Sequence, residues 1–153
     1  MFHGKRVVVV MPAYNAARTL ERTVLEIPMD LVDDVVVTDD ASTDDTVVEA
    51  RRLGLRTLVH GENRGYGGNQ KTCYQEALQL GADVVVMLHP DYQYTPKLLP
   101  SMIGLLTDGP FDVVINCRAF SQLEPDVQAR AARHFELSLR HAGQLVIDTL
   151  NVP

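Results

Sequence analysis

The sequence predicts an α/β domain with a mainly parallel sheet flanked by helices, and three observations support this fold class. Short valine-rich runs recur along the chain between polar turns, as is typical of strands that are buried on both faces. Segments with helical spacing of apolar residues separate these runs. The strand, loop and helix unit repeats four times, which favours right-handed crossovers and a parallel sheet.

Five segments are predicted as strands because they are short, apolar and rich in β-branched residues. The first reads K-R-V-V-V-V-M and is apolar on both faces, so we expect it in the interior of the sheet. The predicted strands cover residues 5–11, 34–38, 56–60, 83–88 and 112–115.

The helices between these strands are predicted from their end signals. Asn15 is the expected N-cap of a helix over residues 16–27. Ser42 and Asp45 form an S-x-x-D cap for a second helix, which stops at Gly54. Two further helices are expected, one from the glycine-rich loop 62–69 to about residue 80 and one from Thr95-Pro96 to about residue 106.

The character of the chain changes near residue 120. Apolar residues between Val127 and Val146 have helical spacing, which predicts an amphipathic C-terminal helix over residues 125–150, with a break at Gly143 as an alternative. We therefore divide the chain into a half-domain over residues 1–118 and a helical tail over residues 119–153. The apolar stripe must be covered, either by the sheet or by a second copy, and we expect a homodimer through residues 125–150.

Composition excludes several classes of protein. The chain has 153 residues with 14 basic and 20 acidic side chains, a net charge of −6, so a general nucleic-acid binder is not expected. Cys73 and Cys117 form neither a disulfide framework nor a zinc motif. The longest apolar runs have five residues, too few to cross a bilayer, and no signal peptide is apparent. These features predict a cytoplasmic protein.

Four polar clusters each follow a predicted strand, at residues 12–15, 39–42, 63–69 and 89–93. In open α/β sheets, ligands bind in the crevice outside the carboxyl ends of the strands. The sequence therefore predicts a ligand site built from these four loops.

The cluster after the fourth strand reads His89-Pro90-Asp91-Tyr92-Gln93. A carboxylate flanked by an imidazole and an amide suits a divalent cation that holds a diphosphate. Mg²⁺ takes carboxylate and phosphate oxygens, and Mn²⁺ also accepts nitrogen ligands. The alternative is an ordinary Pro-Asp turn.

The other three clusters also have a ligand-binding and a structural interpretation. Asp39 and Asp40 can accept a hydrogen bond from a base or a ribose, or can serve the N-terminus of a helix. Tyr14 can stack on a base, or its segment can be a turn and a cap. Arg64 and the backbone amides that follow it favour an anion, but the segment matches neither dinucleotide nor Walker motifs, and a surface loop is the alternative. The other histidines have no metal-binding spacing.

Taken together in this order, four segments resemble glycosyltransferase family 2. They read V-V-V-V-M-P-A-Y-N-A-A-R-T-L, V-V-V-T-D-D-A-S-T-D-D-T, E-N-R-G-Y-G-G-N-Q-K and V-V-V-M-L-H-P-D-Y-Q-Y-T-P. The similarity covers residues 5–118 and is nearest in character to the polyprenyl- or dolichyl-phosphate mannose and glucose synthases. It implies the GT-A fold, which is Rossmann-like.

The resemblance also implies roles for individual residues. The family binds a UDP- or GDP-linked sugar through Mn²⁺ or Mg²⁺ and transfers the sugar to a lipid phosphate or a glycan. By this resemblance the base and nucleotide are held by residues of the first three loops, and the metal and phosphates by residues of the fourth. The first group comprises Pro12, Ala13, Tyr14, Asn15, Asp39, Asp40 and Arg64, and the second comprises Asp91, Gln93 and His89.

Two departures from the family pattern limit this interpretation. His89 stands where the family's D-x-D motif has its first aspartate, and Asn116-Cys117-Arg118 stands where a G-S-R-like step is usual. No downstream aspartate that could act as base is identified, so the catalytic residue is unassigned and the chain is expected to be the donor-binding half. A non-catalytic nucleotide-binding module is the alternative. A nucleotidyltransferase ranks last, because residues 12–15 lack a basic, glycine-rich loop. A lipid acceptor would place the protein at the inner face of the membrane.

Overall fold

The computed structural model describes residues 1–109, 111, 113–115 and 145–148. Within this part, six strands form one sheet in the order β3-β2-β1-β4-β6-β5, and all five strand pairs are parallel. The strands are β1 (Val7–Ala13), β2 (Asp34–Asp39), β3 (Arg56–Val59), β4 (Val84–Met87), β5 (Val113–Ile115) and β6 (Leu145–Asp148). The helices are α1 (Ala17–Leu25), α2 (Thr46–Arg52), α3 (Gly65–Gln79) and α4 (Leu99–Asp108), the last preceded by a 3₁₀ turn over Pro96–Leu98.

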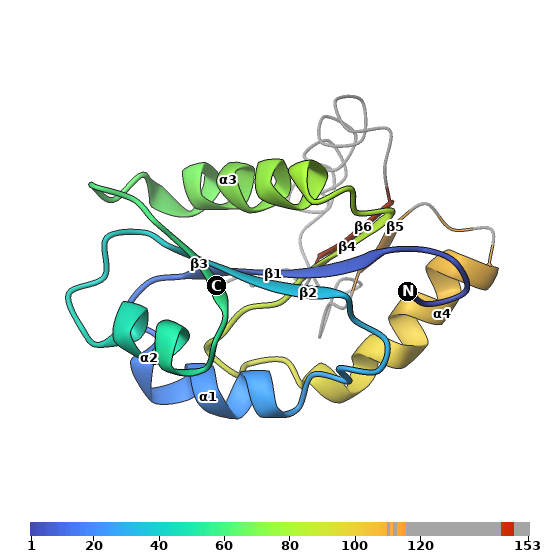
Figure 1. The fold of residues 1–153 in the computed structure, drawn as a ribbon, viewed down its shortest axis with the longest axis horizontal. Coiled ribbons are helices and arrows are strands. Elements are labelled where there is room, and N and C mark those ends of the chain that lie inside the picture. The colour runs from blue at the N-terminus through green and yellow to red at the C-terminus, as the bar shows by residue number, and fades with distance from the viewer. Residues whose placement is uncertain (110, 112, 116–144, 149–153) are drawn as a thin grey trace, which may run out of the picture.

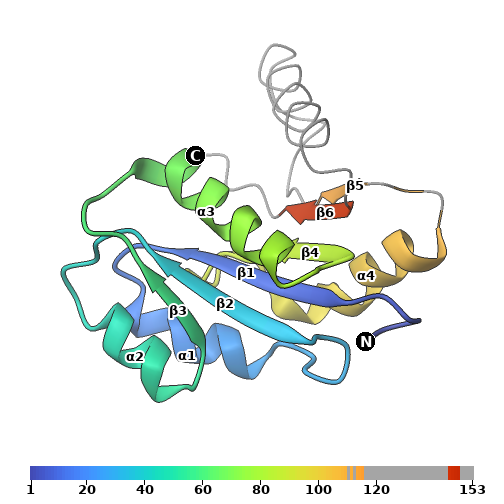
Figure 2. The same cartoon turned by 45° about the horizontal axis from the view of Figure 1, so that its top comes forward.

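The sheet lies between two layers of helices (Figures 1 and 2). Helix α3 covers one face, and α1, α2 and α4 cover the other. The carboxyl ends of β1, β2 and β3 point to the left in Figure 1, where α1, α2 and α3 begin. This is the mainly parallel α/β architecture that the strand and helix pattern predicted.

Alternating residues of β1 explain how both faces of the sheet are buried. Val7, Val9 and Met11 belong to the core that includes α1 and α4, whereas Val8 and Val10 belong to the core under α3. All five side chains have no exposed surface. A strand that packs on both sides gains from apolar residues at every position, which is why its sequence does not alternate.

Two of the predicted helix starts are wrong. Asn15 has a left-handed backbone with φ of 51° and precedes the N-cap, which is Ala16. Its side chain instead accepts a hydrogen bond from the amide of Thr43 at 2.9 Å. Asp45 is the N-cap of α2 but makes no capping hydrogen bond, because Asp44 accepts from the Thr46 amide in its place.

The other predicted helix ends are mostly confirmed, but α3 begins earlier than predicted. Thr95 accepts a hydrogen bond from the Lys97 amide, as expected of a cap before proline. Gly54 and Gly81 follow α2 and α3 with left-handed backbones. Helix α3 begins at Gly65, so the second half of the predicted glycine-rich loop is helical.

The predicted C-terminal helix does not extend over residues 145–148. Leu145–Asp148 is strand β6, which lies between β4 and β5. The run L-V-I-D is compatible with either structure when it is considered alone, and pairing with two strands favours the extended form. Residues 125–144 of the predicted helix, its proposed dimer contact and the predicted boundary between residues 118 and 119 lie outside the described residues.

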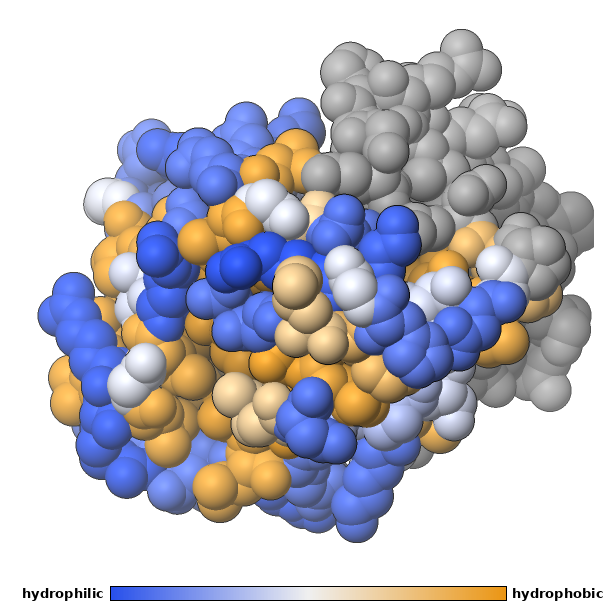
Figure 3. Space-filling model, turned by 45° about the vertical axis from the view of Figure 1, so that its right-hand side comes forward, coloured by the Kyte–Doolittle hydropathy of each residue, from blue (hydrophilic) through white to orange (hydrophobic). Residues whose placement is uncertain are grey.

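None of the described helices has the combination of length and hydropathy that crossing a bilayer requires. Figure 3 brings forward the right-hand side of Figure 1, and hydrophilic and hydrophobic side chains are interspersed over this face.

Candidate functional site

The loops that follow β1, β2 and β3 meet at one edge of the sheet. Ala13, the last residue of β1, is in register with Asp39, the last residue of β2. Asp40 donates its amide to the carbonyl of Ala13, and His60 donates its amide to the carbonyl of Asp39, both at 2.9 Å. The three strand ends are therefore held side by side by backbone hydrogen bonds.

Hydrogen bonds from Asn15 and Asn69 hold this edge of the sheet together. The amide of Asn15 donates to Oγ of Ser42 at 2.8 Å, which ties the first loop to the second. Asn69, buried in α3, donates from Nδ2 to the carbonyl of Thr38 at 3.0 Å and approaches the carbonyl of Ala13 at 3.4 Å. These contacts fix the spacing between the ends of β1 and β2.

Asp39 and Asp40 are both buried but have different partners. Oδ2 of Asp39 accepts the amide of Ser42 at 3.0 Å, and its Oδ1 is buried without a hydrogen bond among the described residues. Oδ1 of Asp40 accepts from Nδ1 of His60 at 2.6 Å and from the amide of Arg64 at 2.9 Å. Asp39 thus serves its own loop, and Asp40 connects β2 to the segments after β3.

These surroundings keep Asp40 ionised. Burial acts to raise the pKa of its carboxyl group, but the hydrogen bonds from His60 and from the amide of Arg64, together with the charge interaction with His60, lower the pKa below its ordinary value. The side chain is 4% exposed. A buried carboxylate at a strand end is a fixed hydrogen-bond acceptor.

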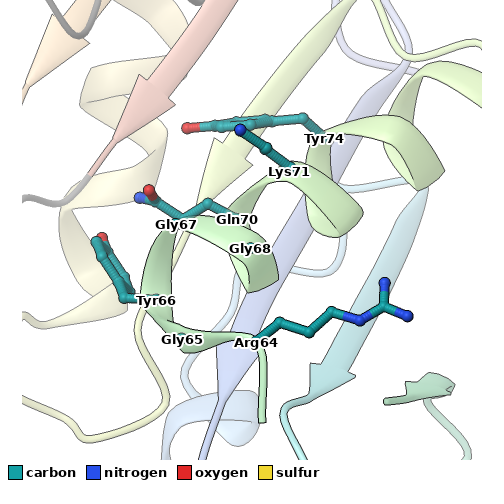
Figure 4. A pocket seen from close by; sticks show the side chains of 8 residues that line it. All are labelled: Arg64, Gly65, Tyr66, Gly67, Gly68, Gln70, Lys71 and Tyr74. Carbon is teal, nitrogen blue, oxygen red and sulfur yellow. The ribbon is translucent and has the colours of Figure 1, made fainter. Parts of the chain in front are cut away.

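The start of α3 forms one wall of an open groove of about 430 Å³, lined by residues between Arg64 and Tyr74 (Figure 4). In Figure 4, Arg64 and Tyr66 point away from each other at the first turn, and Gln70, Lys71 and Tyr74 follow along the helix. Backbone amides at the N-terminus of a helix favour an anion, and Arg64 and Lys71 add positive charge. The groove is therefore suited to phosphate groups.

The loop after β4 is connected to the same helix start. The hydroxyl of Tyr66 lies 3.1 Å from Nε2 of His89, and their ring centroids are 5.5 Å apart. His89 is 6% exposed, whereas Asp91 and Gln93 are exposed. Oδ1 of Asp91 accepts the amide of Gln93 at 3.0 Å, so the loop has the Asp turn that the structural interpretation expected.

Tyr92 anchors this loop to α1. Its backbone is left-handed, with φ of 60°, and its hydroxyl donates to Oε1 of Glu26 at 2.5 Å. The guanidinium of Arg22 lies 3.6 Å from the centre of the Tyr92 ring, a cation–π contact. The side chain of Tyr92 is thereby directed to α1, and its neighbours Asp91 and Gln93 are left at the surface.

The donor atoms of this loop fit a cation that is shared with a ligand. No group of three His, Cys, Asp or Glu side chains gathers into a metal site within the described part of the chain. Mg²⁺ and Mn²⁺ are, however, commonly held by one or two carboxylates together with substrate phosphates. The exposed Asp91, with Gln93 beside it, supplies such a partial site.

The structure thus brings most of the predicted residues together. Pro12 and Ala13 are buried at the end of β1, and Tyr14, 55% exposed, follows on the adjoining loop. The roles of His60, Tyr66 and Asn69 are not apparent from the sequence. Each lies in or next to a segment that was recognised, but a contact across three loops leaves no local pattern in the sequence.

Comparison with known proteins identifies the family. Residues 8–153 match the family described as Glycosyl transferase family 2. The chain belongs to glycosyltransferase family 2. The GT-A fold expected from the resemblance is confirmed by the similarity to solved structures of this fold.

Two relatives illustrate what family members bind. The chain is 24% identical over 131 residues to the UDP-N-acetylglucosamine–dolichyl-phosphate N-acetylglucosaminyltransferase of Methanococcus voltae, covering 74% of this chain and 52% of that protein. Glucosyl-3-phosphoglycerate synthase from Mycobacterium tuberculosis, in complex with Mn²⁺, UDP-glucose and glycerol 3-phosphate, is 26% identical with a TM-score of 0.66, covering 86% of this chain and 51% of that one. A structure of the same enzyme with Mg²⁺ and UDP is 24% identical with a TM-score of 0.65, covering 90% and 53%. The chain spans about half the length of these relatives.

Proposed function

We propose that this chain is the donor-binding half of a glycosyltransferase, which takes a UDP-linked sugar and holds its diphosphate with a divalent cation. The proposal rests on the contacts that the start of α3 makes with the loops after β2 and β4. The amide of Arg64 donates to Asp40, and Tyr66 contacts His89. One short segment therefore connects the loop suited to a base with the loop suited to a cation. The Mycobacterium tuberculosis relative, solved with UDP-glucose and Mn²⁺, supports the same class of donor.

The base of the nucleotide is placed at the ends of β1 and β2. Pro12 and Ala13 form the wall, and Tyr14, which is largely exposed, stacks on the ring. Asp40 accepts an N–H of the base. Asn15 and Asp39, whose hydrogen bonds hold the two loops together, border the pocket.

The diphosphate is placed between the start of α3 and the loop after β4. Asp91 and Gln93 supply oxygen ligands, and His89 supplies an imidazole nitrogen that Mn²⁺ accepts more readily than Mg²⁺ does. Arg64 and the amides of α3 add positive potential. A bound cation would stabilise the negative charge that develops on the leaving nucleoside diphosphate.

For the whole enzyme, a lipid phosphate is the acceptor of first choice, and a glycan is the alternative. The name of the Methanococcus voltae relative includes a dolichyl phosphate, and the Mycobacterium tuberculosis structure holds glycerol 3-phosphate. A lipid acceptor would require the cytoplasmic protein to work at the inner face of the membrane. A glycan acceptor would need a base to remove the proton of its hydroxyl group, and no described residue is assigned to this role.

Calorimetry tests the donor site. UDP-glucose, UDP-N-acetylglucosamine and GDP-mannose are titrated into the protein with and without Mn²⁺. We expect Asp91→Asn to weaken binding of the UDP-sugars by about tenfold or more when Mn²⁺ is present, since a charged ligand is lost, and to leave metal-free binding unchanged. Asp40→Asn should weaken binding in both conditions.

Asp45→Asn is the control, because Asp45 is exposed and makes no capping hydrogen bond. If Asp91→Asn binds UDP-sugars as tightly as the wild type does in Mn²⁺, the assigned site is wrong.

A second candidate is a module that binds the nucleotide without transferring sugar. It is favoured by the contact between Tyr66 and His89, because Nε2 of the imidazole is already within hydrogen-bond distance of the Tyr66 hydroxyl. Release of UDP from a UDP-sugar on addition of a polyprenyl phosphate would exclude this candidate. Tight UDP binding with no release in the presence of any acceptor tried would favour it.

A further inference from the structure

His60 forms a buried link behind Asp40. It is the first residue after β3 and is 7% exposed. Its Nδ1 lies 2.6 Å from Oδ1 of Asp40, and its Nε2 lies 2.9 Å from Oγ1 of Thr72 in α3. His60 thus connects the end of β2 to α3 through its side chain, and its own amide is held by the carbonyl of Asp39.

The chemistry of the three groups determines the direction of these hydrogen bonds. A carboxylate can only accept, so the ring proton lies on Nδ1 of His60 and is donated to Asp40. The hydroxyl of Thr72 can donate to Nε2, or accept from it while donating to the carbonyl of Gly68 at 3.3 Å. The donor to Asp40 is therefore kept whichever way the hydroxyl of Thr72 points.

Two donors to Asp40 end on the same oxygen, and the amide of Gly65 is a further backbone donor to this carboxylate. His60 and the amide of Arg64 bond to Oδ1. Two hydrogen bonds on one oxygen fix the plane of the carboxylate, and they orient the other oxygen, Oδ2, as the acceptor for a ligand. Among these donors within the described residues, His60 contributes the side chain and the others are backbone amides, so His60 is the partner that a substitution can remove.

We propose that His60 is a positioning residue that makes this site select nucleobases with a ring N–H, such as uracil, and reject bases with a bare ring nitrogen, such as cytosine. This inference rests on the proposed function. Uracil presents N3–H to Oδ2 of Asp40, whereas cytosine presents a lone pair at N3. An acceptor facing an acceptor in a buried site leaves both unsatisfied, which disfavours cytosine strongly.

The role of the Nδ1 donor can be separated from the shape of the ring. His60→Asn places an amide donor near the position of Nδ1, whereas His60→Gln places its donor near Nε2, and His60→Leu has no donor. His3→Gln is the matched control, since His3 is an exposed histidine whose Nδ1 lies 2.7 Å from Asp108 and whose segment is remote from the four loops.

The experiment measures the dissociation constants of UDP and CDP by calorimetry for each variant, with the fold checked by circular dichroism. The wild type and His3→Gln are expected to prefer UDP by about a hundredfold, and His60→Leu and His60→Gln by about tenfold or less. His60→Asn should retain most of the wild-type preference. A merely structural role would weaken UDP and CDP alike and leave their ratio unchanged.

The outcomes separate this inference from the function on which it rests. If the wild type prefers UDP and Asp40→Asn abolishes the preference, but folded His60→Leu and His60→Gln keep the wild-type ratio, the role of His60 is overturned while the donor site stands. Equal loss in His60→Asn and His60→Gln would also overturn it, and this comparison remains available if His60→Leu does not fold. If the wild type binds neither nucleotide, both proposals fail.

Discussion

Gly68 has no side chain because Arg64 occupies the space beside it. A Cβ at Gly68 would lie 2.7 Å from Cβ of Arg64, one turn earlier, whereas a Cβ at Gly67 would meet nothing within 4 Å. Two adjacent glycines of α3 are therefore unequal, and only the second is required by a close approach. Arg64 matters because its amide binds Asp40.

Substitution of these two glycines by alanine should have opposite effects. Gly67→Ala is expected to stabilise the protein by about 0.5–1 kcal/mol, because alanine loses less backbone entropy in a helix. Gly68→Ala must displace Arg64, so we expect no gain in stability and a UDP affinity at least several times weaker. Urea unfolding and calorimetry measure the two quantities. Equal behaviour of both variants would show that Arg64 does not restrict position 68.

The contribution of Tyr92 to stability can be measured by removing its hydroxyl group. Its hydroxyl donates to Oε1 of Glu26, whose Oε2 is buried without a partner in the described part of the chain. Tyr92→Phe removes that donor from a partly buried carboxylate, so we expect a loss of about 1–3 kcal/mol in the free energy of unfolding.

The affinity for UDP in the presence of Mn²⁺ provides a second measurement for Tyr92→Phe. Binding of UDP in Mn²⁺ should weaken, since Asp91 and Gln93 flank the anchor. Tyr14→Phe is the stability control, because Tyr14 is 55% exposed and its hydroxyl has no hydrogen bond among the described residues. An unchanged unfolding free energy in Tyr92→Phe would show that the anchor contributes nothing.

At the scale of elements, α1 is capped by a loop that belongs to another helix. The amide of Ala16 donates to Oγ1 of Thr46 at 2.8 Å, and the amide of Ala17 donates to Oδ2 of Asp44 at 3.1 Å. Ala16, the N-cap of α1, has no side chain that could do this. The first turn of α1 and the start of α2 are consequently stabilised together.

Asp44 and Asp45 are adjacent aspartates with different expected effects. Asp44→Ala should destabilise the protein by about 1–2 kcal/mol, because it removes a cap from two helices. Asp45→Ala should change stability by less than about 0.5 kcal/mol, as is usual for an exposed position without such a contact. Urea unfolding at neutral pH measures both. A larger loss in Asp45→Ala than in Asp44→Ala would restore the local cap that the sequence pattern suggested.

These caps show what the sequence could and could not predict. The strands were predictable because a run such as V-V-V-V-M is apolar in any context, and the helix end at Gly54 was predictable because glycine adopts a left-handed backbone. Asn15 was wrong as the cap of α1 because the capping groups come from the start of α2 and the loop before it. Asp45 was wrong as a capping side chain because the adjacent Asp44 accepts from the Thr46 amide. The contact of His60 with Asp40 joins positions 20 residues apart and follows from no local rule.

At the scale of the whole molecule, the order of strands in the sheet also does not follow from local sequence patterns. Strand β6 lies between β4 and β5, although β5 comes first in the sequence. The residues of β6 were predicted as part of a helix because their spacing continued that of the preceding apolar stripe. Pairing with two parallel strands outweighs this spacing, and only the assembled sheet contains that information.

The acidic groups of the site and of the helix caps link the stability of the whole molecule to pH. Asp40 and Asp44 have pKa values below their ordinary value of 3.8. For Asp44, burial acts to raise the pKa, but hydrogen bonds from Thr46 and from the amide of Ala17 outweigh it. A group whose pKa is lower in the folded state binds protons more readily when unfolded. Its stabilising contribution is therefore present above pH 3.8 and is lost as the pH falls through the folded pKa.

Urea unfolding at a series of pH values tests this linkage. The free energy of unfolding should fall as the pH decreases below about 4, where the unfolded aspartates begin to protonate. Asp44→Asn should be less stable than the wild type at neutral pH and should lose less on acidification, so that the two curves converge. Asp45→Asn should follow the wild type throughout. A constant difference between Asp44→Asn and the wild type from pH 7 to pH 2 would mean that the ionised carboxylate is not the stabilising form, because protonation of Asp44 would then cost the fold nothing.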